Sequence, residues 1–238
     1  MTRFEKLRFW TVAILAIFVA VPVLAQGVSD PLDGFDSYIQ EQLELWEVPG
    51  VSVAVVKDHE VVFAKGFGVR HLEKGGEVDA DTLFAIGSNT KAFTATAVGL
   101  LVQDGKIAWD DPVLRYLPEF QMYDPEVTRR ITIRDLLCHR SGIGTFQGDL
   151  ASFNSIYDRA EVMRRIRFIE PVYEFREGYG YSNSMFLTAG LIIPRVTDSS
   201  WDELIETPLF EPLGNGRSNT SVVEYEAATN TATHHGLV

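Results

Sequence analysis

The sequence predicts an α+β (α/β) chain, in which a short antiparallel sheet near the N-terminus is joined to a mostly helical remainder. Two β-branched runs, residues 51–56 and 61–64, flank the polar stretch 57–60, a pattern typical of a β-hairpin. After Gly87 the apolar residues fall mostly into runs of helical length. With 238 residues and 46% hydrophobic content, the chain is long enough to bury a core.

Residues 1–25 have the layout of a secretory signal peptide. Three basic residues among the first eight precede an apolar run over residues 9–24, and the small residue Ala25 follows. We therefore expect cleavage after Ala25, which leaves a domain of residues 26–238. The alternative is an uncleaved transmembrane anchor, because the run approaches the length of a membrane span. Both alternatives place the domain in the periplasm or outside the cell.

The charge balance excludes several classes of partner. Removing residues 1–25 takes away three basic residues and one acidic residue, so the net charge changes from −12 to −14. Such a chain is poorly suited to bind nucleic acid or an anionic lipid surface. We expect contact with a membrane only through an uncleaved N-terminal segment, and the sequence leaves the oligomeric state open.

Cysteine and histidine usage bears on disulfides and metals. Cys138 is the single cysteine, so an internal disulfide is impossible, and we expect it to be a small core residue of an apolar helix. The sequence has five histidines but neither a His-Glu-x-x-His motif nor a spaced Cys/His set. We therefore expect no cofactor and no metal, and a metal hydrolase is disfavoured.

Helix signals recur along the rest of the chain. Thr132 and Asp135 have the spacing of a capping box, and Asp158 and Ser200 stand before two further helical stretches. Pro194 should kink the helix that contains it or end it early. The expected elements are helices over residues 31–46, 88–101, 133–138, 160–169, 184–196 and 201–205, a third strand over residues 68–71, and loop-like chain after Gly214.

A serine and a lysine at the start of the helix after Gly87 form the first candidate site. Ser88 stands near the helix N-terminus and Lys91 follows one turn later, so both lie on the same helix face. Lys91 can then reach the Ser88 hydroxyl, and the positive end of the helix dipole favours negative charge there. This is what an activated serine requires. The alternative is a capping serine followed by a solvated lysine.

Three stretches carry a resemblance to a known family: Ser88-Asn89-Thr90-Lys91, Leu136 to Gly142, and Tyr181-Ser182-Asn183. Their order resembles the serine β-lactamase and penicillin-binding protein superfamily, in the branch that groups class C β-lactamases with related D-amino-acid peptidases and esterases. The Tyr181–Asn183 stretch matches the Tyr-x-Asn element of that branch rather than the Ser-Asp-Asn of class A. The resemblance covers about residues 32–238.

The resemblance implies a β-lactamase/transpeptidase-like fold, with an antiparallel sheet flanked by helices and a mostly helical part. Residues 26–87 would supply the first helix and the N-terminal hairpin of the sheet, and residues 88–238 the mostly helical part. The family's third element, Lys-Thr-Gly or His-x-Gly on a strand lining the site, has no clear match. His234-His235-Gly236 has the letters but follows Tyr181 too closely and has no β-branched strand around it.

We interpret His234–Gly236 as a coincidence in a loop, and we expect the chain to stop before the C-terminal strands of the sheet. Members of this branch usually continue with further strands and a closing helix. Without them the hairpin would keep an unpaired edge and part of its core uncovered. We therefore expect the chain as given to be poorly stable or inactive in isolation.

By resemblance, Ser88 would be the nucleophile, Lys91 and Tyr181 would take its proton, and Asn183 would hydrogen-bond the substrate amide. The Ser88 backbone N–H would form half of an oxyanion hole. The alternatives are a Tyr181 that is only a packed aromatic and an Asn183 that caps the following helix. We interpret His139 as structural, ending a helix and holding loop backbone, because this branch uses lysine and tyrosine for proton transfer.

The resulting functional prediction is an exported serine hydrolase that cleaves an amide or ester through an acyl-enzyme on Ser88. Its substrate is a small molecule or peptide: a β-lactam, a D-amino-acid peptide or a carboxylic ester, since the fold does not choose among them. The alternative is a non-catalytic, truncated relative that binds a ligand or acts as a scaffold.

Overall fold

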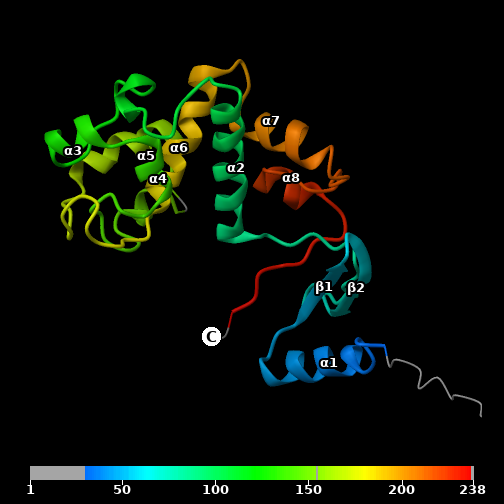
Figure 1. The fold of residues 1–238 in the computed structure, drawn as a ribbon. Helices are drawn as coiled ribbons and strands as arrows, with labels where there is room; N and C mark the ends of the chain where they lie inside the picture. The colour runs from blue at the N-terminus through cyan, green and yellow to red at the C-terminus, as the bar shows by residue number, and fades with distance from the viewer. Residues whose placement is uncertain (1–29, 154, 237–238) are drawn as a thin grey trace, which may run out of the picture.

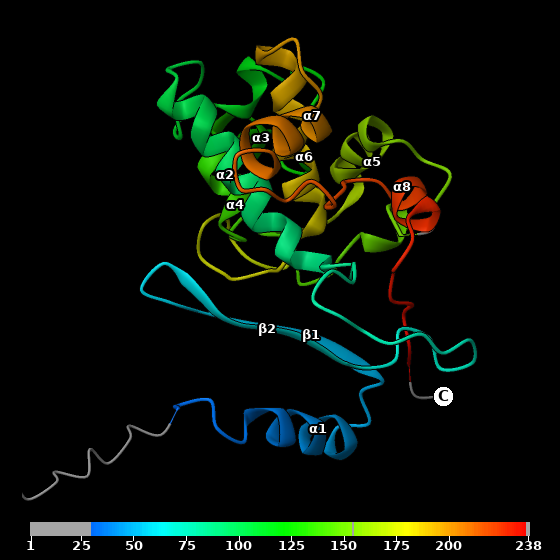
Figure 2. The same ribbon diagram turned by 90° about the vertical axis from the view of Figure 1, so that its right-hand side faces the viewer.

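The computed structural model describes residues 30–153 and 155–236 of the chain. The expected signal peptide therefore lies outside the described residues. Figure 1 shows two parts: a small sheet with one helix, and a larger helical unit that follows it in the sequence. In both Figure 1 and Figure 2 the sheet lies on the side of the helical unit where α2 begins.

The first part contains α1 (Phe35–Leu45) and the strands β1 (Gly50–Lys57) and β2 (Glu60–Gly68). The strands pair antiparallel from Gly50 opposite Gly68 to Lys57 opposite Glu60, with an irregularity between Val55 and Val56. The predicted hairpin is thus confirmed. Helix α1 packs on β2 through aromatic side chains, since the Phe35 and Phe63 rings lie 5.1 Å apart edge to face.

The predicted third strand over residues 68–71 is wrong. Strand β2 continues to Gly68, which adopts a left-handed conformation (φ +74°) and turns the chain away. Beyond it, Val69 forms only an isolated bridge with Glu77. The reason is local, because the chain folds back on itself at once and the Arg70 N–H donates to the Gly76 carbonyl (2.8 Å).

The helical unit is built around α2, which contacts α6 and α7, while α6 also contacts α4 and α5. Figure 1 shows α2 standing between the α3–α6 side of the unit and the pair α7 and α8. Its helices are α2 (Thr90–Gln103), α3 (Pro125–Arg130), α4 (Ile133–Leu137), α5 (Arg159–Arg165), α6 (Asn183–Val196), α7 (Trp201–Ile205) and α8 (Val222–Ala227).

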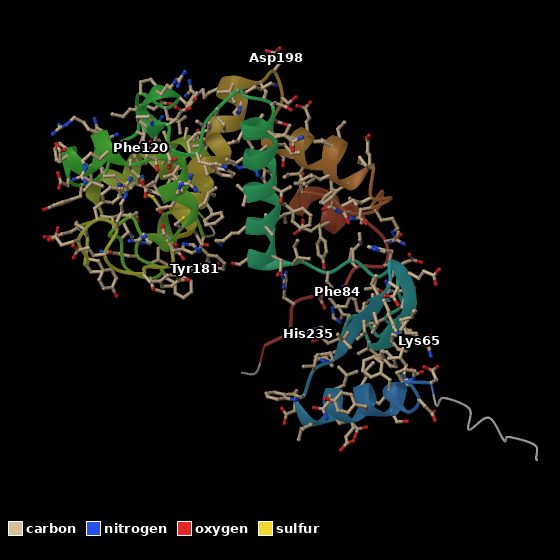
Figure 3. The ribbon with its side chains drawn as sticks, viewed as in Figure 1. Lys65, Phe84, Phe120, Tyr181, Asp198 and His235 are labelled. Atoms are coloured by element: carbon tan, nitrogen blue, oxygen red, sulfur yellow. The ribbon has the colours of Figure 1, made fainter. Side chains whose placement is uncertain are left out.

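Short helical turns connect these helices: Gly87–Asn89, Val113–Arg115, Asp149–Ala151, Ile166–Phe168 and Glu206–Phe210. The core of the unit is apolar and contains Phe120, which Figure 3 labels among the helices. Among the described residues, no helix has the length and apolar character needed to cross a membrane.

The predicted helix caps are confirmed. Thr132 and Asp135 form a reciprocal capping box at the start of α4, as Ser200 and its partner Glu203 do at α7. The Asp158 side chain accepts the Glu161 N–H at the start of α5. Such side chains satisfy backbone N–H groups that have no partner within the helix.

Three details differ from the sequence-based expectations or refine them. Helix α6 passes through Pro194 and ends at Val196, two residues later. Helix α8 lies where only loop was expected, and the Ser221 side chain caps it. Cys138 is exposed rather than a core residue. The reason is that α4 ends at Leu137, so Cys138 is the residue after the helix instead of part of its apolar face.

Candidate active site

The predicted Ser88–Lys91 pair is present at the start of α2. The helical turn Gly87–Asn89 leads directly into α2, so Ser88 and Lys91 lie on neighbouring turns. Ser88 is exposed, and the Lys91 ammonium donates to Ser88 Oγ over 3.2 Å. The serine hydroxyl is therefore open to an incoming molecule while the Lys91 ammonium contacts it.

The Tyr181 loop contacts the same serine. The Tyr181 hydroxyl donates to Ser88 Oγ over 2.7 Å, although the two residues are far apart in the sequence. Figure 3 places Tyr181 at the edge of the helical unit near the start of α2. The loop backbone is held on both sides, because the Phe146 N–H donates to the Tyr181 carbonyl (2.9 Å) and the Tyr181 N–H donates to Thr145 Oγ1 (3.2 Å).

The Tyr181 ring is also packed among neighbouring side chains. His139 stacks on it with ring centroids 4.4 Å apart, and Phe146 meets it edge to face at 5.2 Å. The Lys91 ammonium lies 4.6 Å from the centroid of the same ring. This packing fixes the direction of the phenol oxygen toward Ser88.

His139 holds the loop that carries Tyr181. Its carbonyl accepts the Gly180 N–H (2.9 Å), and its ring Nδ1 accepts the Ser182 N–H (3.1 Å). Burial, and then the charge of Lys91, lower the pKa of His139. A neutral ring with Nδ1 as acceptor agrees with these contacts and with the structural role expected for this residue.

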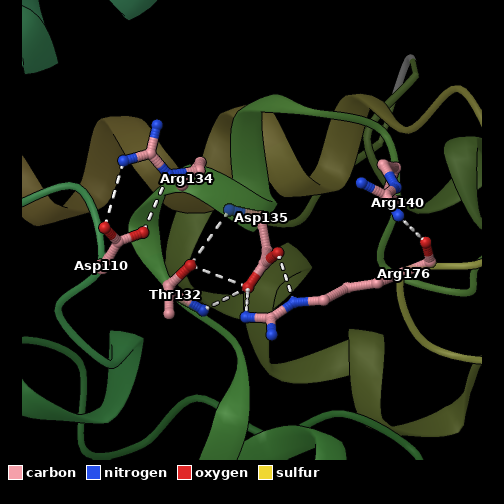
Figure 4. A network of polar contacts seen from close by, with 6 residues as sticks. All are labelled: Asp110, Thr132, Arg134, Asp135, Arg140 and Arg176. Carbon is pink, nitrogen blue, oxygen red and sulfur yellow. Dashed lines mark hydrogen bonds and ion pairs between the residues drawn. The ribbon is translucent and has the colours of Figure 1, made fainter.

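Figure 4 shows a polar network that links the start of α4 to the chain around Arg176. The Arg176 guanidinium donates two hydrogen bonds to the buried Asp135 carboxylate, at 2.9 and 2.7 Å. Asp135 also belongs to the capping box with Thr132, and the Arg176 N–H donates to the Arg140 carbonyl (2.9 Å). The start of α4 and the chain that leads to Tyr181 are thereby tied together.

Close backbone contact adds a further constraint at Gly180. A Cβ atom at this position would lie 1.8 Å from the Ile143 carbonyl oxygen, so only glycine fits without a shift of the backbone. The backbone of Gly180 therefore packs directly against the Ile143 carbonyl, which limits the positions that Tyr181 can adopt.

Asn183 connects Lys91 to a carboxylate that the sequence analysis missed. Its Oδ1 accepts from the Lys91 ammonium over 2.6 Å, and its Nδ2 donates to Asp149 Oδ2 over 2.7 Å. The cap of α6 is Ser182, whose side chain accepts the Met185 N–H, so Asn183 is the first helical residue instead. Asp149 is the first residue of the short helical turn Asp149–Ala151, and no sequence motif marks it.

The electrostatics of the cluster favour ionisation of the phenol. Hydrogen bonding to Lys91, and then to Ser88, lowers the pKa of Tyr181, while burial and the charge of Asp149 act against this shift. The net direction is downward because a nearby cation and a hydrogen-bond donor stabilise a phenolate.

A cavity of about 490 Å³ opens beside Ser88 and Lys91 and runs between α2 and α6. Trp201 lines it, with an indole N–H that donates to Thr94 Oγ1 (3.2 Å) and a ring that packs beside Gly190. The apolar lining residues are Gly87, Phe186, Leu187, Gly190, Leu191, Pro194 and Trp201, and Arg159 contributes a cation. Pockets of this size and lining commonly hold small-molecule ligands.

The His234–Gly236 stretch has no strand around it. His235 accepts the Leu72 N–H (3.3 Å) and contacts Thr233 and the His71 ring, which belong to the loop region near the sheet. Within residues 30–153 and 155–236, no group of three or more potential metal ligands comes together.

The fold and the meeting of the Ser-x-x-Lys and Tyr-x-Asn residues define a member of the serine β-lactamase and penicillin-binding protein superfamily. The Beta-lactamase family model matches residues 35–238, so the chain belongs to this family. The β-lactamase/transpeptidase-like fold expected from the sequence is thus confirmed.

Three comparisons support this placement. The chain is 34% identical over 194 residues to "Unguisins hydrolase ungD" of Aspergillus violaceofuscus, covering 78% of this chain and 34% of that protein. It resembles the octameric penicillin-binding protein homologue of Pyrococcus abyssi with a TM-score of 0.74 and 30% identity, covering 85% and 47% of the two chains. A class C β-lactamase shares the fold with a TM-score of 0.68 at 24% identity, covering 84% and 53%.

The chain therefore spans about a third of the length of the fungal hydrolase and about half the length of the solved structures. The family is one of serine hydrolases.

Proposed function

We propose that this chain is a serine hydrolase that cleaves a carboxylic ester or an amide through an acyl-enzyme on Ser88. The observation that carries the proposal is the meeting of two proton-transfer groups on one exposed hydroxyl. Tyr181 OH lies 2.7 Å and Lys91 Nζ 3.2 Å from Ser88 Oγ. Both distances are within the range required for proton transfer.

The acylation step follows from this geometry. Ser88 Oγ attacks the carbonyl carbon while its proton passes to the Tyr181 phenolate or to a neutral Lys91 amine. The Ser88 N–H, in the first helical turn, faces the negative charge that develops on the carbonyl oxygen. Collapse of the tetrahedral intermediate breaks the bond to the leaving group, which takes up the proton. A water molecule then releases the acyl group by the reverse sequence and restores Ser88.

The cavity beside Ser88 supports an apolar acyl group as the part of the substrate that this chain recognises. Its walls are largely aliphatic and aromatic, from Phe186 to Trp201, and its volume of about 490 Å³ exceeds the need of an acetyl group. Burial of each methylene contributes about 0.8 kcal/mol. We therefore propose that esters or amides of longer acyl groups react faster than acetyl derivatives.

Hydrolysis of chromogenic substrates tests the proposed function. The substrates are an acyl ester series, a D-amino-acid amide and a β-lactam, measured with the unaltered chain and with Ser88→Ala. Loss of the nucleophile should lower kcat/KM by a factor on the order of a thousand or more. Ser218→Ala, in an exposed loop, is the matched control and should leave the rate unchanged. If the unaltered chain and Ser88→Ala both show only the background rate of hydrolysis, a non-catalytic binding or scaffolding protein is favoured instead.

We also propose that the protein is exported to the periplasm or the exterior, on the basis of the basic and apolar segments in residues 1–25. The N-terminus of protein recovered from each cell fraction tests this. Chain beginning at Gln26 outside the cytoplasm supports export with cleavage, and chain beginning at Met1 in the cytoplasm contradicts it.

A further inference from the structure

We propose that Asp149 is a positioning residue, which acts through Asn183 to keep the lone pair of Lys91 directed at Ser88. The inference rests on the proposed hydrolase function and concerns a residue with no known motif. Asp149 enters from the helical turn Asp149–Ala151, on a loop separate from α2 and from the Tyr181 loop. It reaches the site only through Asn183 Nδ2, over 2.7 Å.

The chemistry of the carboxylate decides how the Asn183 amide is oriented. An ionised carboxylate only accepts hydrogen bonds, so the amide must turn its NH2 group to Asp149 and its oxygen to Lys91. The oxygen then accepts a Lys91 N–H over 2.6 Å. With the amide reversed, two oxygens would face each other at Asp149, which is repulsive.

This orientation matters for proton transfer. A neutral lysine amine has one lone pair, and the same lone pair must receive the Ser88 proton. If Asn183 could turn over, its NH2 group would donate to that lone pair and occupy it. Asp149 prevents this, so that the lone pair of a neutral Lys91 is left for Ser88 Oγ, which lies 3.2 Å away and accepts from the ammonium when Lys91 is protonated.

The second oxygen of Asp149 indicates that the carboxylate is not held there for stability. Asp149 Oδ1 is buried and accepts no hydrogen bond from any residue in the described part of the chain. A buried charged oxygen without a partner costs free energy of folding. Groups of this kind often persist where function requires them.

Asp149 also contributes to the charge around Lys91. The titratable groups that face Lys91 are Tyr181 from its loop, His139 after α4, and Asp149 beyond Asn183. The Asp149 charge raises the pKa of Tyr181, because a nearby anion disfavours a phenolate. Removal of this charge should therefore let the phenolate of Tyr181 appear at lower pH.

The experiment measures the rate at which a fluorophosphonate labels Ser88 in the full chain, as a function of pH. In this reaction Ser88 Oγ bonds to phosphorus, fluoride leaves, and the serine proton passes to the basic groups of the site. Asp149→Asn keeps the shape but can present either an oxygen or an NH2 group to Asn183. We expect the plateau rate to fall about tenfold or more, because an orienting charge-assisted hydrogen bond is lost.

Two further results separate a positioning role from a structural one. The acid limb of the pH profile should move to lower pH, and the melting temperature of Asp149→Asn should be unchanged or higher than that of the parent chain. In an Asn183→Ala background, Asp149→Asn should cause no additional fall in the plateau rate, because the orienting effect of Asp149 on Lys91 requires the Asn183 amide. Asp124→Asn, at the cap of α3, is the matched control and should leave the rate unchanged.

The inference is overturned if Asp149→Asn labels at the parent rate with the same pH profile. It is also overturned if its rate loss is as large without Asn183 as with it, or if the rate falls only together with the melting temperature. If Asp149→Asn does not fold, this refutes the expectation that its melting temperature is unchanged or higher than that of the parent chain. If the unaltered chain is not labelled at Ser88 at all, the proposed hydrolase function fails, which is a distinct result.

Discussion

The Asp135–Arg176 pair gives the most quantitative prediction for how the fold holds the site. Asp135 is 9% exposed at its side chain, accepts two hydrogen bonds from Arg176 and completes the cap of α4. Asp135→Asn leaves one of the two oxygens and places an NH2 group against a guanidinium. A charge-assisted hydrogen bond contributes about 1.5–3 kcal/mol. Because Arg176 is 42% exposed, solvent weakens these hydrogen bonds. We therefore expect Asp135→Asn to lower the free energy of unfolding by about 2 kcal/mol.

The loss should depend on pH in a defined direction. Burial by itself would raise the pKa of Asp135, but the hydrogen bonds from Arg176 and Thr132 outweigh it and lower the pKa. A carboxyl with a lowered folded-state pKa stabilises the fold fully above its unfolded-state pKa, about 3.9. This contribution is lost as the pH falls through the folded-state pKa. The difference between the parent and Asp135→Asn should therefore be complete at neutral pH and shrink below about pH 3.9.

Urea unfolding followed by circular dichroism measures this difference, and a loss of 2 kcal/mol corresponds to a midpoint shift on the order of 1 M. The matched control is Asp110→Asn, which removes an ion pair with Arg134 whose side chains are 74% and 51% exposed. An exposed pair contributes about 0–1 kcal/mol. Equal midpoints for the Asp135 and Asp110 variants, or a difference that persists unchanged at pH 2.5, would refute the reasoning.

Three further predictions concern the site itself. Gly180→Ala places a Cβ 1.8 Å from the Ile143 carbonyl, so it should displace the Tyr181 loop and abolish fluorophosphonate labelling of Ser88; labelling at the parent rate would contradict this. Tyr181→Phe should lower the acylation rate about a hundredfold and remove the rise in rate with pH that phenolate formation causes, as a pH–rate profile would reveal. Trp201→Ala removes an apolar wall of the cavity and should lower kcat/KM for an octanoyl ester about tenfold with little change for an acetyl ester; an equal change in both would argue against the cavity as the acyl site.

Local sequence patterns predicted the parts of the structure that depend on neighbouring residues. The hairpin follows from two β-branched runs, and the contact between Ser88 and Lys91 follows from helical spacing. The cap at Thr132 was also readable, because a capping box needs only residues three positions apart. Ser221 and Glu224 have the same spacing and mark the start of α8, although no helix was expected there.

The parts that failed depend on where an element ends. Cys138 is exposed because α4 stops one residue before it, and His139 then takes a left-handed conformation (φ +57°). The expected third strand does not form because Gly68 turns the chain into a tight local loop. Neither ending is encoded by hydrophobic periodicity, since both arise from backbone conformations at single residues.

The site shows the same division. The contact of Tyr181 with Ser88 joins residues 93 positions apart, and only the resemblance to a family anticipated their meeting. Asp149 begins a short helical turn whose position is set by tertiary contacts, so no motif could have marked it. Long-range placement of polar groups therefore required the structure.

The central claim is that Ser88 is an activated nucleophile. The most direct test is the intact mass of the protein before and after treatment with a fluorophosphonate, with Ser88→Ala as the control. We predict one adduct on the unaltered chain at neutral pH and none on Ser88→Ala, a result that would overturn the sequence-based expectation that the chain is inactive in isolation. An unmodified parent chain, or an adduct that persists in Ser88→Ala, would contradict the claim.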